Sequence, residues 1–242
     1  MRLDKLLAHT GFGTRKEVKK IIKDKYITVN GEIVRDPGTK VDPDVDDVRV
    51  GGTQIFYEEF VYYMLNKPAG VISATEDFVH ETVLDLLDPS DIVQEPHPVG
   101  RLDIDTEGLL ILTNDGQLTH QLTSPKKAVD KEYYAEIAGI VTEEDIEKFK
   151  EGLYIDDDID EAFTALPAQL EIIDIIEEDN ASVIHVTVQE GKFHQVKRMF
   201  QAVDKEVTYL KRIRMKALKL DDRLQYGEYR RLTDEEVALL KE

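Results

Sequence analysis

Cysteine is absent from this chain of 242 residues. Without it the chain can form neither disulfide bonds nor thiolate metal sites, so disulfide-stapled secreted domains and cysteine-ligated zinc modules are excluded. The sequence also contains no apolar run as long as a membrane span, and no signal-peptide core follows Met1–Asp4. We therefore expect a cytoplasmic protein with no membrane association, long enough for one large domain or for a small and a medium domain.

Positive charge is scarce overall but is concentrated in two segments. The net charge of −19 disfavours contact with nucleic acid, because phosphate binding needs local positive potential. Residues 1–40, however, hold ten Lys or Arg against five Asp or Glu, and residues 192–219 hold nine against two. The acids gather elsewhere, at Glu143–Asp145 and Asp156–Asp158, where we expect solvated surface that could also repel a nucleic acid from wrong orientations.

The segment Gly100–Gly116 joins a polar Gly-Arg-x-Asp loop to an apolar strand. The continuous apolar run Leu109–Leu112 is closed by Asn114–Gly116, a pattern typical of a strand that is covered on both faces and ends in a turn. The loop before it is therefore held on a rigid element. Arg101 and Asp103 supply a guanidinium and a carboxylate that can orient a phosphate or a neighbouring acid.

Spacing alone leaves other chemistry open for these acids. A calcium loop needs ligands at its first, third and fifth residues and a bidentate Glu at its twelfth. Asp103, Asp105 and Glu107 match the first three, but the twelfth residue is Asn114. A shared carboxylate pair, as in glycosidases or aspartic proteases, is disfavoured because residues two apart on an extended segment point to opposite faces. A polar turn with capping acids is the structural alternative.

Four ordered motifs resemble those of the RsuA-type pseudouridine synthases. In chain order, the segments that look like the first, catalytic, lysine–aromatic and last motifs are Met64–Val71, Gly100–Gly116, Lys131–Tyr133 and Glu190–Phe200. Because these motifs extend over nearly the whole chain, it is identified as a member of that family. The resemblance implies isomerisation of one uridine of ribosomal RNA to pseudouridine, with no cofactor and no metal.

The resemblance also implies roles for residues at the catalytic site. Asp103 would act on the ribose of the target, either as a nucleophile at the anomeric carbon or as a base at C2′. Tyr133 would stack on the target base, and Arg101 would contact the substrate. Lys197 would pair with Asp103. Lys67 is placed among the substrate-binding residues, and it looks like a structural support of the active-site loop.

The last motif can also be interpreted from its spacing. Val196, Met199, Phe200 and Val203 follow the i, i+3, i+4, i+7 pattern of a helix with one buried face. Lys197 and Arg198 then fall in its first turn, where the macrodipole disfavours cations, so they either extend to solvent or meet an anion. By resemblance, Lys192 and Arg198 would meet RNA phosphates. We interpret His194 as a packing or RNA contact rather than a catalytic base.

The N-terminal basic segment has the pattern of a small RNA-binding domain. Thr14–Glu17 forms a capping box that opens a helix with an apolar stripe at Val18, Ile21 and Ile22. The remaining face of this helix is basic and consists of Arg15, Lys16, Lys19, Lys20 and Lys23. A hairpin with a type I′ turn at Asn30-Gly31 follows. The order of these elements resembles the S4-like domain, which implies that the basic face contacts RNA.

We expect an α+β protein with two domains. The Gly-Gly and polar stretch before Phe60 places the boundary near residue 58, which gives an S4-like domain at 1–58 and a catalytic domain at 59–242. The second domain should have a mixed, largely antiparallel sheet with flanking helices, and its strands should include Tyr133–Ile140 and Ser182–Gln189. We expect a monomer whose partner is ribosomal RNA.

Within the family, the motifs look most like the branch that modifies 16S rRNA, and branches acting on 23S rRNA are the alternative. A non-catalytic RNA-binding or ribosome-assembly protein is a second alternative. The sequence departs from the family pattern at Arg214–Lys216, where Ile-Gly is usual, and at Glu81, where proline is common. These departures leave the catalytic residues in place but put RNA contacts at those two positions in doubt.

Overall fold

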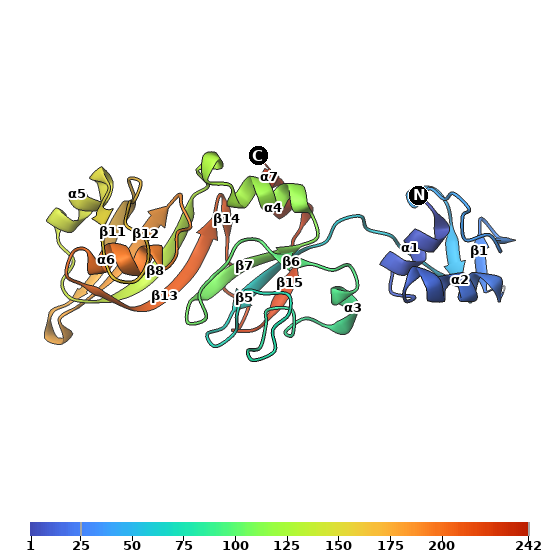
Figure 1. The fold of residues 1–242 in the computed structure, drawn as a ribbon, viewed down its shortest axis with the longest axis horizontal. Coiled ribbons are helices and arrows are strands. Elements are labelled where there is room, and N and C mark those ends of the chain that lie inside the picture. The colour runs from blue at the N-terminus through green and yellow to red at the C-terminus, as the bar shows by residue number, and fades with distance from the viewer. Residues whose placement is uncertain (25, 242) are drawn as a thin grey trace. The chain divides into compact units, whose positions relative to one another are not determined.

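The computed structural model describes residues 1–24 and 26–241 (Figure 1). Its contacts divide the chain into two compact units, one formed by residues 1–61 and 87–96 and the other by residues 62–86 and 97–242. The division falls after Val61, near the boundary expected at residue 58. Within the described residues, no helix has both the length and the apolar composition needed to span a bilayer.

In the described residues the first unit contains three helices and a four-stranded sheet. Its helices are α1 (Leu3–His9) and α2 (Arg15–Lys23), with the short α3 (Pro89–Ile92) in the later segment. Its sheet has the order β2-β1-β3-β4, formed by β1 (Ile27–Val29), β2 (Glu32–Ile33), β3 (Val48–Val50) and β4 (Thr53–Gln54). The expected capping box opens α2, and the hairpin turns through positive φ at both Asn30 and Gly31, as a type I′ turn requires.

The second unit is built on a nine-stranded sheet of order β11-β12-β8-β13-β7-β5-β15, with β14 paired to β13 and β6 to β7. The strands on the main path are β11 (Gln169–Ile176), β12 (Ala181–Val188), β8 (Lys131–Ala138), β13 (Glu206–Met215), β7 (Glu107–Thr113), β5 (Tyr62–Lys67) and β15 (Tyr229–Arg231). The short strands are β14 (Leu218–Lys219) and β6 (His97–Pro98), and β9 (Tyr154–Ile155) pairs separately with β10 (Phe163–Thr164). Only β13 and β7 run parallel among these pairs, so the expected mixed, largely antiparallel sheet is confirmed.

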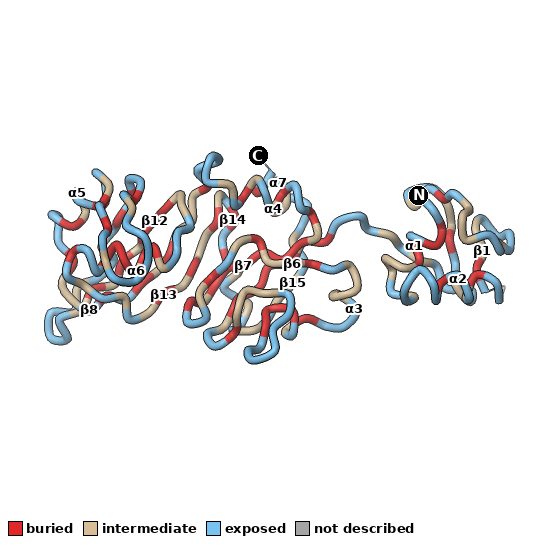
Figure 2. Tube along the Cα trace, in the orientation of Figure 1, coloured by how far each residue is buried: buried red, intermediate tan, exposed pale blue. Residues whose placement is uncertain are grey.

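Helices cover this sheet in two groups (Figure 1). Helix α5 (Glu143–Glu151) packs on β11 and α6 (Gln195–Gln201) packs on β13, and the two helices meet where the rings of Phe149 and Phe200 lie 4.9 Å apart. The other group consists of α4 (Gly116–Thr123) and α7 (Asp234–Lys241). The 3₁₀ turn η1 (Pro125–Lys127) follows α4, and the 3₁₀ turn η2 (Glu177–Asp179) joins β11 to β12. Figure 2 shows the buried residues running along the sheet beneath these helices. Strand β7 is buried from Gly108 to Thr113, as the apolar run predicted.

Two acids that we expected on the solvated surface are not free surface groups. Asp145 is buried, caps α5 through the backbone N–H of Thr142, and lies 3.0 Å from Lys205 Nζ. Asp157 accepts a hydrogen bond of 2.8 Å from Arg198 Nε. The expectation was wrong for these two residues because each carboxylate serves as the partner of a cation from a distant part of the chain.

Candidate active site

The loop that carries Asp103 runs between β6 and β7 and is anchored by the buried side chain of Lys67. Lys67, which is 0% exposed, donates from Nζ to the backbone carbonyls of Pro68 at 2.9 Å, Thr106 at 2.8 Å and Ile104 at 3.4 Å. Burial lowers the pKa of Lys67 to about 8. Lys67 therefore supports the loop from beneath, and its place among the substrate-contacting residues is corrected because its ammonium does not reach the surface.

A second anchor holds the opposite side of the loop. The hydroxyl of Ser73 donates to the carbonyl of Leu102 and accepts from its N–H, both at 3.0 Å. The backbone N–H of Gly70 also donates to the carbonyl of Ile104 at 2.7 Å. These hydrogen bonds hold Leu102 and Ile104, the residues before and after Asp103. The backbone of Asp103 is therefore fixed, and so is the direction from which its carboxylate faces the pocket.

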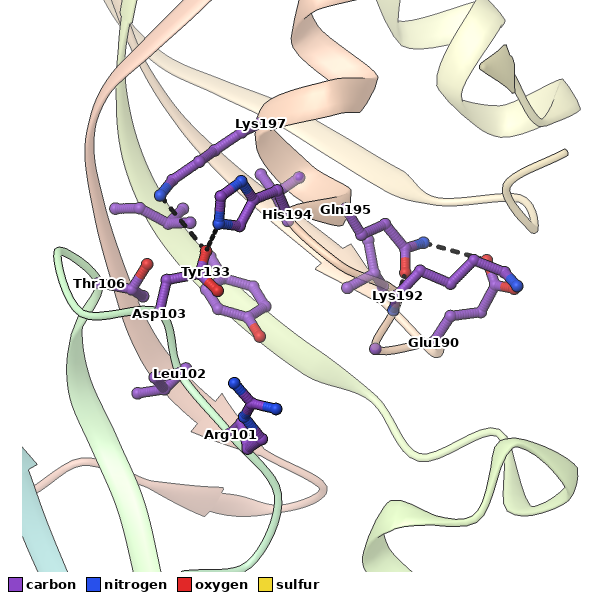
Figure 3. Close-up of a pocket in the computed structure, with 14 residues that line it drawn as sticks. Arg101, Leu102, Asp103, Thr106, Tyr133, Glu190, Lys192, His194, Gln195 and Lys197 are labelled. Atoms are coloured by element: carbon purple, nitrogen blue, oxygen red, sulfur yellow. Dashed lines mark hydrogen bonds and ion pairs between the residues drawn. The ribbon is translucent and has the colours of Figure 1, made fainter. Parts of the chain in front are cut away.

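Asp103 and Asp105 converge on one ammonium group. Lys197 Nζ lies 3.3 Å from Asp103 Oδ2, the contact drawn in Figure 3, and 2.6 Å from Asp105 Oδ1. The expectation that these two acids point to opposite faces was wrong, because the loop is not extended there: the N–H of Thr106 bonds back to the carbonyl of Asp103 at 3.1 Å. Burial favours a higher pKa for Asp105, but the hydrogen bond and charge of Lys197 outweigh it, so the pKa of Asp105 is lowered.

His194 lies at the start of α6 and faces the same carboxylate. Its backbone adopts the left-handed conformation, with φ of 48°, and its Nε2 lies 3.7 Å from Asp103 Oδ2. Its ring stacks on Phe193, with centroids 3.8 Å apart. Both neighbours limit the movement of the imidazole, which fits the packing or RNA-contact interpretation.

Arg198 does meet an anion, but the anion belongs to the protein. The guanidinium is 1% exposed, bonds to Asp157, and donates from Nη2 to the carbonyls of Asp160 and Glu161. It also lies over the ring of Phe163, 4.9 Å from the centroid. The expectation that Arg198 contacts RNA phosphates is therefore corrected, since its side chain is fully engaged inside the fold.

Tyr133 forms one wall of the pocket in front of Asp103 (Figure 3). It lies on β8 with Ala135 and Ile137 on the same buried face, as the alternation predicted. The side chains around this pocket that bear on chemistry are Arg101, Asp103, Tyr133, Lys192, His194 and Lys197. Every site residue expected in the catalytic domain thus gathers at one place, except Lys67 below the loop and Arg198 inside the fold.

The basic face of α2 belongs to the first unit. Lys16, Lys19 and Lys20 are exposed on it. Arg15 is exposed as well, but its Nη2 lies 3.0 Å from Oδ1 of the buried Asp4. The hydrogen bond from Arg2, aided by Arg15, lowers the pKa of Asp4 to about 2. Arg15 therefore ties α2 to α1, while the three lysines point outward.

Two site features were missed by the sequence analysis. Asp105 shares Lys197 with Asp103, and no local pattern indicates the turn that brings it there. Arg212, on β13 directly opposite Tyr133 in the sheet register, is 2% exposed, and it donates from Nε to the carbonyl of Leu109 at 2.8 Å. A basic residue in the middle of a strand gives no sign in the sequence that its side chain is buried.

Two family models and a solved structure match this chain. The family model described as RNA pseudouridylate synthase matches residues 61–202, and the S4 domain model matches residues 1–47. A solved structure, "Crystal structure of pseudouridylate synthase", is 35% identical to this chain with a TM-score of 0.67, and the match covers 99% of both chains.

Curated relatives match over the whole length. The uncharacterized RNA pseudouridine synthase YtzG of Bacillus subtilis (strain 168) is 49% identical, covering 100% of this chain and 99% of the relative. Ribosomal small subunit pseudouridine synthase A of Escherichia coli (strain K12) is 39% identical, covering 98% and 99%. Ribosomal large subunit pseudouridine synthase B of Bacillus subtilis is also 39% identical, covering 99% and 95%. The chain therefore belongs to the RNA pseudouridylate synthase family, isomerases that convert uridine in RNA to pseudouridine, and it begins with an S4 domain.

Proposed function

We propose that this chain isomerises one uridine of the small-subunit 16S ribosomal RNA. The small-subunit relative at 39% identity and the motif pattern support this target. The large-subunit relative at the same identity supports 23S rRNA as the alternative. In this proposal residues 59–242 carry the reaction and residues 1–58 bind RNA, and the protein acts in the cytoplasm as a monomer without a cofactor or a metal.

The observation that carries the proposal is the contact of Lys197 with Asp103 at the rim of the pocket formed by Tyr133. The ammonium of Lys197 is a counter-charge for this carboxylate, and a carboxylate can act as a nucleophile or a base. The rigid loop holds this carboxylate in one position, so little reorganisation is needed when a ribose arrives.

The reaction requires the target base to leave the RNA stack, because the glycosidic bond is otherwise shielded. The carboxylate of Asp103 then attacks the anomeric carbon, or removes the proton at C2′, and the bond from the anomeric carbon to N1 of uracil breaks. Tyr133 and the apolar walls retain the uracil while it rotates. Carbon 5 of uracil then bonds to the anomeric carbon. In the nucleophile route this step breaks the ester bond to Asp103, and in the base route Asp103 returns the proton to C2′. Loss of the proton on carbon 5 and protonation of N1 complete pseudouridine.

Exposed cations and His194 contact the RNA outside the reacting uridine. In the catalytic unit these are Arg101 and Lys192 beside the pocket. In the first unit they are Lys16, Lys19 and Lys20 on α2. Phosphate contacts of this kind fix the register of the RNA and make binding depend on salt, without selecting the sequence.

Mapping pseudouridines in ribosomal RNA from cells with and without this gene tests the proposal. We expect one site in 16S rRNA to disappear on deletion, to return with the wild-type gene, and to stay absent with Asp103→Asn. Loss of a 23S site instead would assign the chain to the large-subunit branch. An unchanged map with intact RNA binding would make it a non-catalytic RNA-binding protein.

A further inference from the structure

A second pocket, of about 340 Å³, adjoins the catalytic pocket. The two pockets share Arg101, Tyr133 and Lys192, and Figure 3 shows these three residues around the catalytic pocket. Four cationic side chains line the second pocket, which we call the basic pocket: Arg101, Lys131, Lys192 and Arg212. Such a concentration is unexpected in a chain with a net charge of −19.

The sheet register places two of these cations beside the target-base wall. Lys131 and Tyr133 are two residues apart on β8 and therefore face the same side. Arg212 on β13 is the direct partner of Tyr133 in the antiparallel pairing, so it faces that side too. Arg101 and Lys192 are exposed at the mouth of the pocket, and Arg212 is buried.

None of the four cations has an anionic partner in the described part of the chain. No Asp or Glu oxygen there lies within 4.0 Å of their side-chain nitrogens. Arg212 Nη2 is buried and lacks a hydrogen-bond partner among residues 1–24 and 26–241, and Lys131 Nζ donates only to the carbonyl of Val129 at 3.1 Å. The pocket's own acid, Glu190, already accepts bonds from Leu166 and Gln195.

Unpaired buried cations are costly, and folded proteins normally pair them or bind an anion there. Desolvation and the neighbouring Arg212 lower the pKa of Lys131 to about 8, against a smaller opposing effect of Asp130. The basic pocket therefore holds four cationic side chains against one carboxylate, Glu190, which forms no ion pair with them in the described part of the chain. An anion bound there would offset the cost of burying these cations and the repulsion between Lys131 and Arg212.

We propose that the basic pocket binds a phosphodiester group of the RNA strand that carries the target uridine. The assignment rests on the proposed function, because it takes Tyr133 as the residue that stacks on the base. Residues two apart on a strand are separated by about 6.7 Å, a span that one nucleotide can bridge between its base and its phosphate. The guanidinium groups and Lys131 would donate to the phosphate oxygens from the floor and the mouth of the pocket.

The test uses the full chain with Lys131→Met, which removes the charge but keeps the length of the side chain. We expect the variant without RNA to melt about 2 to 4 °C higher than wild type, because an uncompensated charge has been removed. Its affinity for a short RNA hairpin with an unpaired uridine should fall about tenfold, and its salt slope should decrease by about one. Lys131→Arg should retain the affinity, and the exposed Lys219→Met is the control for a lost charge elsewhere.

Binding of small molecules to the wild-type protein is a second measurement, and it does not depend on whether the variant folds. Uridine 5′-monophosphate should raise the melting temperature more than uridine does, and Lys131→Met should remove that difference. A lower melting temperature of Lys131→Met with unchanged RNA affinity and salt slope would make Lys131 a purely structural residue and overturn the proposal. A site that inorganic phosphate fills, with RNA affinity independent of Lys131, would also overturn it.

These outcomes are distinct from those of the proposed function. The binding measurements need no modified nucleotide, so they remain valid if no uridine in ribosomal RNA proves to be a target. Conversely, if the pseudouridine map changes on deletion and Lys131→Met has the affinity, salt slope and turnover of wild type, the proposed function stands and the basic pocket is not a phosphodiester site.

Discussion

Lys197 Nζ lies 3.3 Å from Asp103 Oδ2, so the last motif of the chain supplies the cation that faces the acid of the catalytic loop. Replacing it with Met removes the positive charge beside both carboxylates and the hydrogen bond that lowers the pKa of Asp105. The rate of single-turnover isomerisation should fall about 10²- to 10³-fold at neutral pH, a larger loss than the loss in RNA affinity. A single-turnover rate near wild type at saturating RNA, together with weakened RNA binding, would reassign Lys197 to RNA docking.

Asp103→Asn should abolish isomerisation, with a loss on the order of 10⁴-fold or more. A neutral amide can act neither as a nucleophile nor as a base, whereas the phosphate contacts persist. RNA affinity should therefore stay within a few fold of wild type in a binding assay on the same preparation. Asp105→Asn is the matched control and should retain turnover. If Asp103→Asn turns over at a rate near wild type, Asp103 is not the catalytic group.

The lysines on α2 should contribute to RNA affinity through charge alone. Replacing Lys16, Lys19 and Lys20 by Ala should weaken RNA binding and reduce its salt slope by up to about 2 to 3. Deletion of residues 1–58 should have the same effect and leave a folded catalytic domain. The melting temperature of the triple variant checks that the first unit is intact. A salt slope equal to that of wild type would show that this face is not an RNA contact.

Local signals in the sequence predicted the elements around the site. The capping box of α2, the apolar run of β7 and the alternation around Tyr133 each depend on neighbouring residues only, and the structure has all three. Helix α4 was missed because Asn114–Gly116 reads as a turn, whereas Asp115 caps a helix by accepting from Leu118. A cap and a turn use the same residue types.

Long-range pairing could not be predicted in the same way. Nothing near Arg198 indicates that its guanidinium reaches Asp157, which lies 41 residues earlier. The segment Arg214–Lys216, where the family usually has Ile-Gly, contains a backbone feature that the sequence alone did not predict. Lys216 adopts φ of 54°, in the left-handed region that favours glycine.

Lys67→Met should damage the active-site loop without touching the substrate. Three backbone carbonyls lose their donor, and each buried unsatisfied group costs about 1–3 kcal/mol. We expect a lower melting temperature and a lower kcat, with RNA affinity nearly unchanged. Because burial lowers the pKa of Lys67 to about 8, the unfolded chain holds a proton between about pH 8 and 10.5 that the folded chain has released. The free energy of unfolding of wild type minus that of Lys67→Met should therefore increase with pH across this window.

The variant Arg198→Met tests whether Arg198 stabilises the fold or contacts RNA. The guanidinium is 1% exposed and bonds to Asp157, so its removal leaves that carboxylate and two backbone carbonyls without their donor. Breaking one side of such a buried pair costs about 3 kcal/mol, and the cost belongs at the lower end of the usual range because Asp157 is partly exposed. Denaturant unfolding should show this loss, and Asp157→Asn should show a smaller one because an amide oxygen still accepts the bond. The RNA salt slope should match wild type below the unfolding transition, since no phosphate contact is removed. A reduced slope in a fully folded variant would instead restore Arg198 as an RNA contact.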